Sequence, residues 1–269
     1  MRAVINLYLE LAGGKGGVAH VPDIPGCLFR GADREALVGR ASAEVGRYLD
    51  WCAAHGLGDL DSRVSAIVKA RRKAVQASGP ALVLRVAEEK EGAAIWESGA
   101  PAVLFDRDRE PLEDASVHAH FRVVRAAYEE IARHLSPLDD ADLELAPPDG
   151  SRSIAGTLDH IGHCLWWYCS RLSDELPEPG DECPKGGLAR IQCLIPWAEG
   201  WLTAVPAERR ADVVVPARFP SSDPAEEWTF AKVCRRQAEH IVEHIGALSA
   251  RANELLDRDS VRSHRSADI

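Results

Sequence analysis

No apolar run in this 269-residue sequence is long enough to cross a bilayer. The longest apolar runs, such as "VINLYL" and "ALVLRV", fall far short of the roughly 20 residues that a membrane helix needs. The N-terminus also lacks a basic start, a leader-length apolar run and a cleavage pattern, so no secretory signal is visible. With 46% hydrophobic and 28% charged residues the composition is that of a globular protein. We therefore expect a cytoplasmic protein without a membrane partner.

Paired cysteine motifs are absent as well. The seven cysteines are odd in number, scattered, and never spaced as CxxC. This spacing speaks against a disulfide framework and against a thiolate zinc cluster. The sequence thus predicts reduced thiols.

An excess of positive charge is also missing, since the net charge is −10. Residues 1–110 carry 15 basic and 15 acidic side chains, whereas residues 111–269 carry 17 and 27. Nucleic acid is therefore not expected as a partner of the second part, because phosphate binding requires a basic footprint. The one basic run, "KARRK" at residues 69–73, is interpreted as a solvated helix face.

The first third of the chain alternates between strand and helix patterns. Glycines in "GGKGG" predict a hairpin turn rather than a phosphate-binding loop, because that loop needs Ser or Thr after its lysine. Apolar residues at three- to four-residue spacing then predict a helix that ends near Gly56. The expected order is three strands, two helices and a strand, at residues 2–11, 18–21, 26–31, 33–55, 63–77 and 81–87.

The stretch "HVPDIPGCLFRGADREALVGRASAEVGRYLDW" resembles the HicB-like family, and the resemblance covers roughly residues 2–55. It implies a small RNase H-like α/β fold, often found as the antitoxin partner of a ribonuclease toxin. Nuclease chemistry is not implied, because it needs several convergent carboxylates and only Asp23 lies in the motif. We interpret "PDIPGC" as a rigid turn with Cys27 facing the core.

The rest of the chain is helical in pattern after a charged, proline-containing linker at residues 106–114. Pro196 should kink or split the third of its helices. Long amphipathic helices favour a four-helix bundle. The predicted class is α+β: an RNase H-like domain at 1–108, an all-α bundle at 109–256 and a disordered tail at 257–269, with bundle helices at 115–135, 153–172, 188–205 and 226–256.

The stretch "EHIVEH" places His240 and His244 one helical turn apart, so both rings can reach a single ion. They follow the apolar seam of the last helix, where unpaired polar rings would each cost about 1 to 3 kcal/mol. A third ligand should come from a facing helix, and His160 lies nearer the apolar stripe of the second bundle helix than His163, which should face solvent or an interface. No such pairing exists for His118, His120 and His134, so they should be surface or satisfied core residues.

The segments "SIAGTLDHIGHCLWWY" and "EEWTFAKVCRRQAEHIVEH" resemble the DinB/YfiT-like family of four-helix metalloproteins over about residues 114–250. The resemblance implies that His160, His240 and His244 hold a divalent ion, commonly zinc or nickel. It also implies frequent homodimers. Family members of known activity include thiol-dependent S-transferases and isomerases, so we expect a metal-dependent transferase or hydrolase with a small, thiol-containing substrate. Catalytic residues are not identified.

Other interpretations stay open. Cys164, one turn after His160, could be a fourth ligand that makes the site structural. "HIVEH" also fits the H-x-x-E-H of inverted zinc proteases, which need a further acidic ligand downstream. Alternatively, the chain is a non-catalytic regulatory or scaffolding protein whose first domain binds a protein partner and whose metal is structural. For a three-histidine site, metal occupancy should fall as the pH drops through about 6.5.

Overall fold

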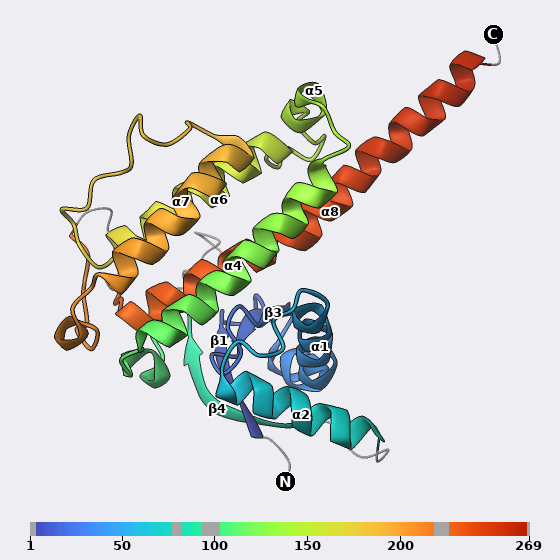
Figure 1. Ribbon diagram of the computed structural model, residues 1–269. Coiled ribbons are helices and arrows are strands. Elements are labelled where there is room, and N and C mark those ends of the chain that lie inside the picture. Colours follow the sequence, from blue (N-terminus) through green and yellow to red (C-terminus); the bar gives the residue numbers. More distant parts are fainter. Residues whose placement is uncertain (1–3, 77–81, 93–102, 218–225, 268–269) are drawn as a thin grey trace.

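The computed structural model describes residues 4–76, 82–92, 103–217 and 226–267 of the chain. A small sheet with two helices is followed by a helix bundle (Figure 1). One cluster of buried hydrophobic residues extends through both parts, from Ile5 to Leu255. The predicted α+β class is confirmed.

The N-terminal part is built on a mixed four-stranded sheet in the order β3-β2-β1-β4. Strand β1 pairs antiparallel with β2 and parallel with β4. The glycine-rich segment between β1 and β2 is a turn, as predicted, in which Lys15 donates its backbone N–H to the carbonyl of Ala12 at 2.9 Å. The elements of this part are β1 (Val4–Leu11), β2 (Gly17–His20), β3 (Leu28–Gly31), α1 (Arg34–Ala54), α2 (Ser62–Gln76) and β4 (Val83–Glu91).

The "PDIPGC" segment between β2 and β3 is a tight turn packed against helices. Gly26 has a φ of 78°, a conformation that glycine adopts without steric cost. The Tyr48 hydroxyl donates to the carbonyl of Pro25 at 2.6 Å and so ties the turn to α1. Burial raises the pKa of the Cys27 thiol well above its usual value, which supports a structural rather than a reactive cysteine.

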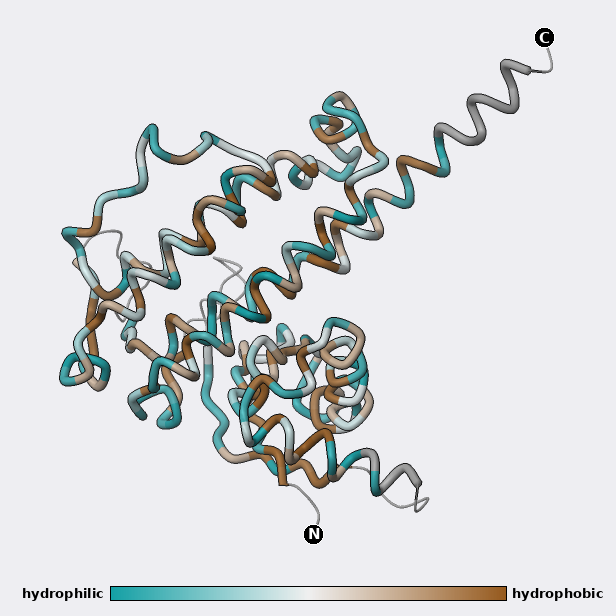
Figure 2. Tube along the Cα trace, viewed as in Figure 1, coloured by the Kyte–Doolittle hydropathy of each residue, from teal (hydrophilic) through white to brown (hydrophobic). Residues whose placement is uncertain are grey.

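The second part is a bundle of four long helices. Helix α4 packs on α7 and α8, and α6 packs on the same two helices, so the four close around a common core. Hydrophobic residues recur at intervals along them, as the amphipathic pattern requires (Figure 2). Pro196 lies inside α7 without splitting it. The elements are η1 (Asp106–Arg109), α4 (Asp114–Leu135), α5 (Asp140–Glu144), α6 (Ile154–Ser170), α7 (Gly187–Thr203), η2 (Ala207–Arg209) and α8 (Phe230–Ala267).

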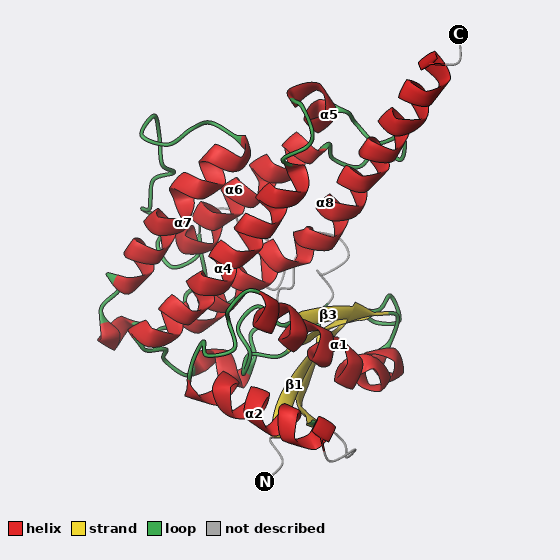
Figure 3. Cartoon of the chain, turned by 45° about the vertical axis from the view of Figure 1, so that its right-hand side comes forward, coloured by secondary structure: helices red, strands yellow, loops and turns green. Residues whose placement is uncertain are grey.

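The two parts lie side by side. The pair α4/α8 separates the N-terminal sheet and its helices from α6 and α7, as two views of the chain show (Figures 1 and 3). Helix α8 continues to Ala267 and projects beyond the other bundle helices. It thereby includes most of residues 257–269, which the sequence pattern assigns to a tail. Among the described residues, no helix has the length and apolarity that a membrane span requires.

The predicted linker at residues 106–114 contains a short helical turn: η1 forms there and Asp108 is buried against α8, whereas most of the other residues of the segment are exposed. One sequence prediction is wrong. The cysteines are not all reduced, because Cys183 and Cys193 form a disulfide. The segment before α7 folds back onto that helix and brings their Cα atoms to 5.9 Å, a proximity that the spacing of ten residues does not reveal. The five other cysteines are free and buried.

Candidate metal centre

Helices α6 and α8 carry the candidate ligands, and local contacts fix where each helix begins and how the two are aligned. The Ser153 side chain accepts from the backbone N–H of Gly156 at 3.0 Å and caps α6. The Thr229 hydroxyl does the same for Lys232 at 3.2 Å at the start of α8. Between the helices, Gln237 donates to the carbonyl of Leu165 at 2.8 Å, three residues before His240.

The three predicted histidines meet at one point between these helices. The Nε2 atom of His240 lies 3.0 Å from Nε2 of His160 and 3.2 Å from Nε2 of His244. A neutral ring nitrogen offers either one N–H or one lone pair, so His240 Nε2 can form a hydrogen bond with only one of these neighbours. A cation that accepts a lone pair from each ring would satisfy all three nitrogens.

The geometry fits a transition metal. Donor atoms of His160, His240 and His244 all lie within 4.8 Å of one another. Zn–N distances of 2.0–2.1 Å in a tetrahedral site imply N···N separations of about 3.3 Å, close to the two that these rings show. Imidazole is also a preferred ligand of zinc and nickel. The group could therefore hold a divalent ion after small movements of the rings.

Electrostatics keeps these imidazoles neutral, the form that binds a metal. Burial, followed by the charge of Arg152, lowers the pKa of His160 to about 4. Burial and the neighbouring His244 lower the pKa of His240 well below its usual value. The pKa of His244 is also lowered, mainly by burial, although the Glu243 carboxylate opposes the shift.

Cys164 lies beside the cluster but outside it. Its Sγ atom is 3.6 Å from Nδ1 of His160, yet it does not join the group whose donor atoms lie within 4.8 Å of one another. Burial raises the pKa of its thiol to about 12. His163 is exposed and contacts Glu178 at 3.4 Å, as its position opposite the apolar stripe predicts.

The remaining histidines named from the sequence lie away from the cluster. His118 is exposed and pairs with Glu199 at 2.8 Å, and His134 lies 3.6 Å from Glu130. His120 is buried, with its Nδ1 atom 2.7 Å from the carbonyl of Ser116. They are surface or satisfied core residues, as predicted.

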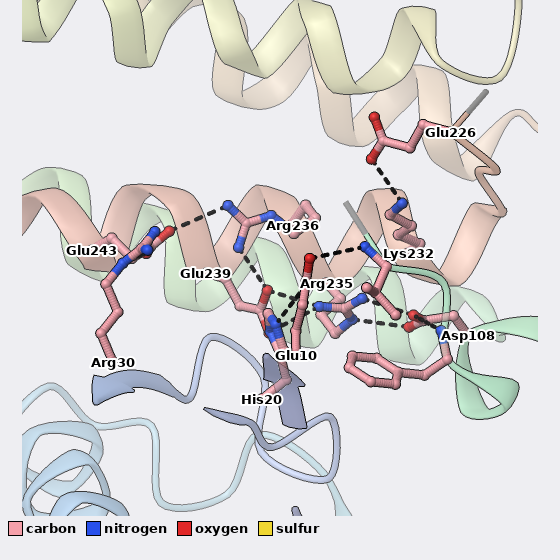
Figure 4. Close-up of polar contacts among 12 residues, drawn as sticks. Glu10, His20, Arg30, Asp108, Glu226, Lys232, Arg235, Arg236, Glu239 and Glu243 are labelled. Atoms are coloured by element: carbon pink, nitrogen blue, oxygen red, sulfur yellow. Dashed lines mark hydrogen bonds and ion pairs between the residues drawn. The ribbon is translucent and has the colours of Figure 1, made fainter. Parts of the chain in front are cut away.

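A buried network of charges, absent from the sequence-based interpretation, joins the N-terminal part to α8 next to the cluster (Figure 4). Arg235 donates to both carboxylate oxygens of Asp108, at 2.9 and 2.7 Å, and to Glu239 at 3.0 Å. Glu239 also contacts Nδ1 of His20 on β2 at 2.9 Å. Although burial opposes it, the charge of Arg235 holds the pKa of Glu239 well below its usual range.

A second branch of this network reaches the exposed edge of the cluster. Arg236 donates to Glu239 at 2.9 Å and to Glu243 at 3.2 Å, and Glu243 in turn pairs with Arg30 of β3 at 2.9 Å (Figure 4). Glu243 is thus held by two arginines rather than standing free. The only sequence signal for these residues is the density of charge in "CRRQAEHIVEH", on a helix that also has to pack.

A cavity of about 560 Å³ adjoins the cluster, and His244 forms part of its wall. The other lining residues come from the loop before α6, from the first turn of α6 and from α8. Its volume is within the range of small-molecule sites. The arrangement therefore combines a potential ion site with space for a small ligand.

The comparison with family models matches residues 124–248 to the DinB superfamily. This range includes His160, His240 and His244, so the segment that carries the three candidate ligands is similar to DinB superfamily domains. No family match confirms the HicB-like resemblance or an RNase H-like fold for the N-terminal part. Searches of curated proteins and of solved structures found no match.

Proposed function

We propose that the chain is a metal-dependent enzyme of DinB type, in which His160, His240 and His244 hold a divalent transition metal, zinc or nickel. It acts as a transferase or hydrolase on a small, thiol-containing substrate bound in the adjoining cavity. The convergence of three Nε2 atoms beside a cavity of ligand size is the observation that supports this proposal. A bound ion would lower the pKa of a coordinated water or thiol and so supply a nucleophile at neutral pH.

The chain's own residues prepare the site for this chemistry. Burial keeps the three rings neutral. The Tyr168 ring packs edge-on against His240 with the centroids 5.6 Å apart, which limits access of water from that side. Three protein ligands without Cys164 match the pattern of catalytic rather than structural zinc sites.

Metal analysis of the full-length protein and two histidine variants tests the proposal. The wild-type protein, stripped with a chelator and reloaded with Co²⁺ or Zn²⁺, should retain about one ion per chain after gel filtration. His240→Ala removes a ligand from the centre of the group and should weaken binding about 100-fold or more. The exposed His163→Ala is the matched control and should bind like the wild type. Absence of stoichiometric metal from the wild type would rule the site out.

One observation favours a second candidate, a scaffolding protein with a structural metal. The buried charge network attaches the N-terminal part to α8 one residue before His240, so an ion at the cluster would also stiffen the docking helix. The two candidates differ in coordination. A spectroscopic count of water on the Co²⁺ ion should find at least one exchangeable water for the enzyme and none for a closed structural site.

The proposal extends to the remaining features that the family resemblance implies. We place the protein in the cytoplasm and propose that it forms homodimers. We also propose that its HicB-like part binds a protein partner. Five buried free cysteines are consistent with a reducing compartment, whereas the Cys183–Cys193 disulfide is not typical of one. Light scattering of the purified chain tests the dimer, and affinity capture with residues 1–108 intact tests the partner.

A further inference from the structure

The cavity beside His244 has a cationic wall. Of the residues that line it, Arg152 comes from the loop before α6 and Arg251 from α8, while Ile154 and Leu248 give it an apolar floor. The geometry points to a binding site for a small carboxylate: we propose that the substrate carries a carboxylate that pairs with Arg152, while its other end faces the histidine cluster. This inference names the substrate class of the proposed function and rests on it for the role of the cluster.

Arg152 is an available cation. Its side chain is exposed, and the described part of the chain offers it neither a hydrogen bond nor an ion pair. Its charge nevertheless reaches the cluster, because it contributes to lowering the pKa of His160, His240 and His244. An arginine near three nitrogens that would bind a cation repels that cation. A ligand that bridges the two would neutralise it.

Arg251 is a second cationic side chain in the cavity wall that a bound anion would stabilise. Its Nη1 atom donates to Glu254 at 2.7 Å, but its Nε and Nη2 atoms are buried and find no hydrogen-bond partner among the described residues. A guanidinium left partly unpaired in this way destabilises the folded chain. A negative charge in the cavity would reduce that cost even without direct contact, because the unpaired nitrogens of Arg251 are themselves buried.

The acidic residues of the wall are already engaged. Asp149 accepts a hydrogen bond from the backbone N–H of Ser151 at 2.9 Å. Glu254 pairs with Arg251 and lies 3.9 Å from Arg258. Arg152 is therefore the charge in the cavity wall that a bound anion would neutralise. Arginine presents a planar fork of donors that matches a carboxylate in two parallel hydrogen bonds.

Two thiols that differ only at one end test the inference. We would titrate 3-mercaptopropionate and the neutral 3-mercapto-1-propanol into the full-length protein by calorimetry at pH 7, with Co²⁺ bound and with the metal removed. The wild type should bind the carboxylate at least about tenfold more tightly in both forms, the size of effect expected for a charge-assisted pair. Arg152→Gln should abolish this preference.

The matched control is Arg47→Gln, which removes the same charge from an exposed position on α1 and should keep the preference. Equal affinities of the wild type for the two thiols, or a preference that survives in Arg152→Gln, would overturn the carboxylate site. Either result leaves the metal site untouched, because Co²⁺ loading is measured separately. If Co²⁺ does not bind, the proposed function fails, and the titration of the metal-free protein still decides whether Arg152 recognises a carboxylate.

Discussion

At the residue scale, His240 has the most constrained position in the candidate site. It is 9% exposed, its Nε2 atom touches those of both other histidines, and Tyr168 packs against its ring. His160 and His244 are each only partly buried. Substrate and ion would therefore approach from the side of His244 and the cavity, while His240 anchors the group in the core.

The lowered pKa values shift the pH at which a bound metal should be released. Protons and metal compete for the same lone pairs, and a ring with a lowered pKa stays unprotonated to a lower pH. Because the pKa of His160 is lowered to about 4, occupancy should persist below 6.5, where unperturbed histidines would already release the ion. Metal content after dialysis at stepped pH measures this.

Circular dichroism at each pH is the control. Release of the metal reports on the histidines only if it occurs at a pH at which the helices are still folded. Half-release at or above pH 6.5 would contradict the electrostatic account of the site. The expectation from sequence alone, a loss near 6.5, is thus displaced to more acid conditions by burial and by Arg152.

At the scale of elements, α8 carries both the candidate ligands and the residues that dock the N-terminal part. Arg235 and Glu239 face β2 and η1, whereas His240 and His244 face α6. Since all of these are on one rigid helix, any change that tilts α8 for docking also moves the ligands. The buried ion pairs of Arg235 and Glu239 therefore help to position the histidine cluster.

Replacement of one buried arginine tests the docking contribution. Arg235→Met leaves Asp108 and Glu239 buried without their main partner and should lower the free energy of unfolding by about 3 to 5 kcal/mol. Arg258→Met on the same helix is the control: that side chain is half exposed, and its loss should change stability by less than about 1 kcal/mol. Urea denaturation measures both. Similar midpoints for the two variants would show that the network adds little.

At the scale of the whole molecule, the two parts are packed together rather than linked loosely. The turn at Gly26 lies directly against α4, since a Cβ atom placed there would be 2.8 Å from Val123 and 2.5 Å from the Tyr48 hydroxyl. With the ion pairs of His20 and Arg30 to α8, this contact closes the interface along one side. The N-terminal part therefore presents its "PDIPGC" turn to the bundle.

Replacing each of two glycines by alanine distinguishes the effect of this packing on stability from the effect of backbone strain. Gly26 and Gly56 both have positive φ, 78° and 68°, so Ala at either should cost about 1 kcal/mol from the backbone. Gly56→Ala meets nothing within 4 Å, whereas Gly26→Ala must displace Tyr48 and Val123, which adds about 1 to 3 kcal/mol. Denaturant unfolding of the two variants gives the difference. Equal losses would mean that the turn does not pack as described.

The features that could be predicted from the sequence are those that depend on residues close together in the chain. Helices of the bundle and the i,i+4 placement of His240 and His244 follow from apolar periodicity and helical geometry, which depend on neighbours within a few residues. The capping role of Ser153 follows from its type and position. The nomination of His160 needed only its angle to the apolar stripe, and the structure brings it to the other two. The sequence alone therefore determined the class of fold and the three candidate ligands.

Tertiary structure decided the features that depend on residues far apart in the chain. These features are the pairing of Asp108 with Arg235, the disulfide of Cys183, the position of Cys164 outside the group and the charge of Arg152, which is unpaired within the described ranges. All of them depend on how helices and loops are aligned in space. No local periodicity encodes that alignment, because it is set by the packing of many side chains at once. From the sequence, the charged residues of "CRRQAEH" would be expected on the solvent-exposed face of a helix. Only the tertiary structure, in which the N-terminal sheet docks on α8, shows that they are buried.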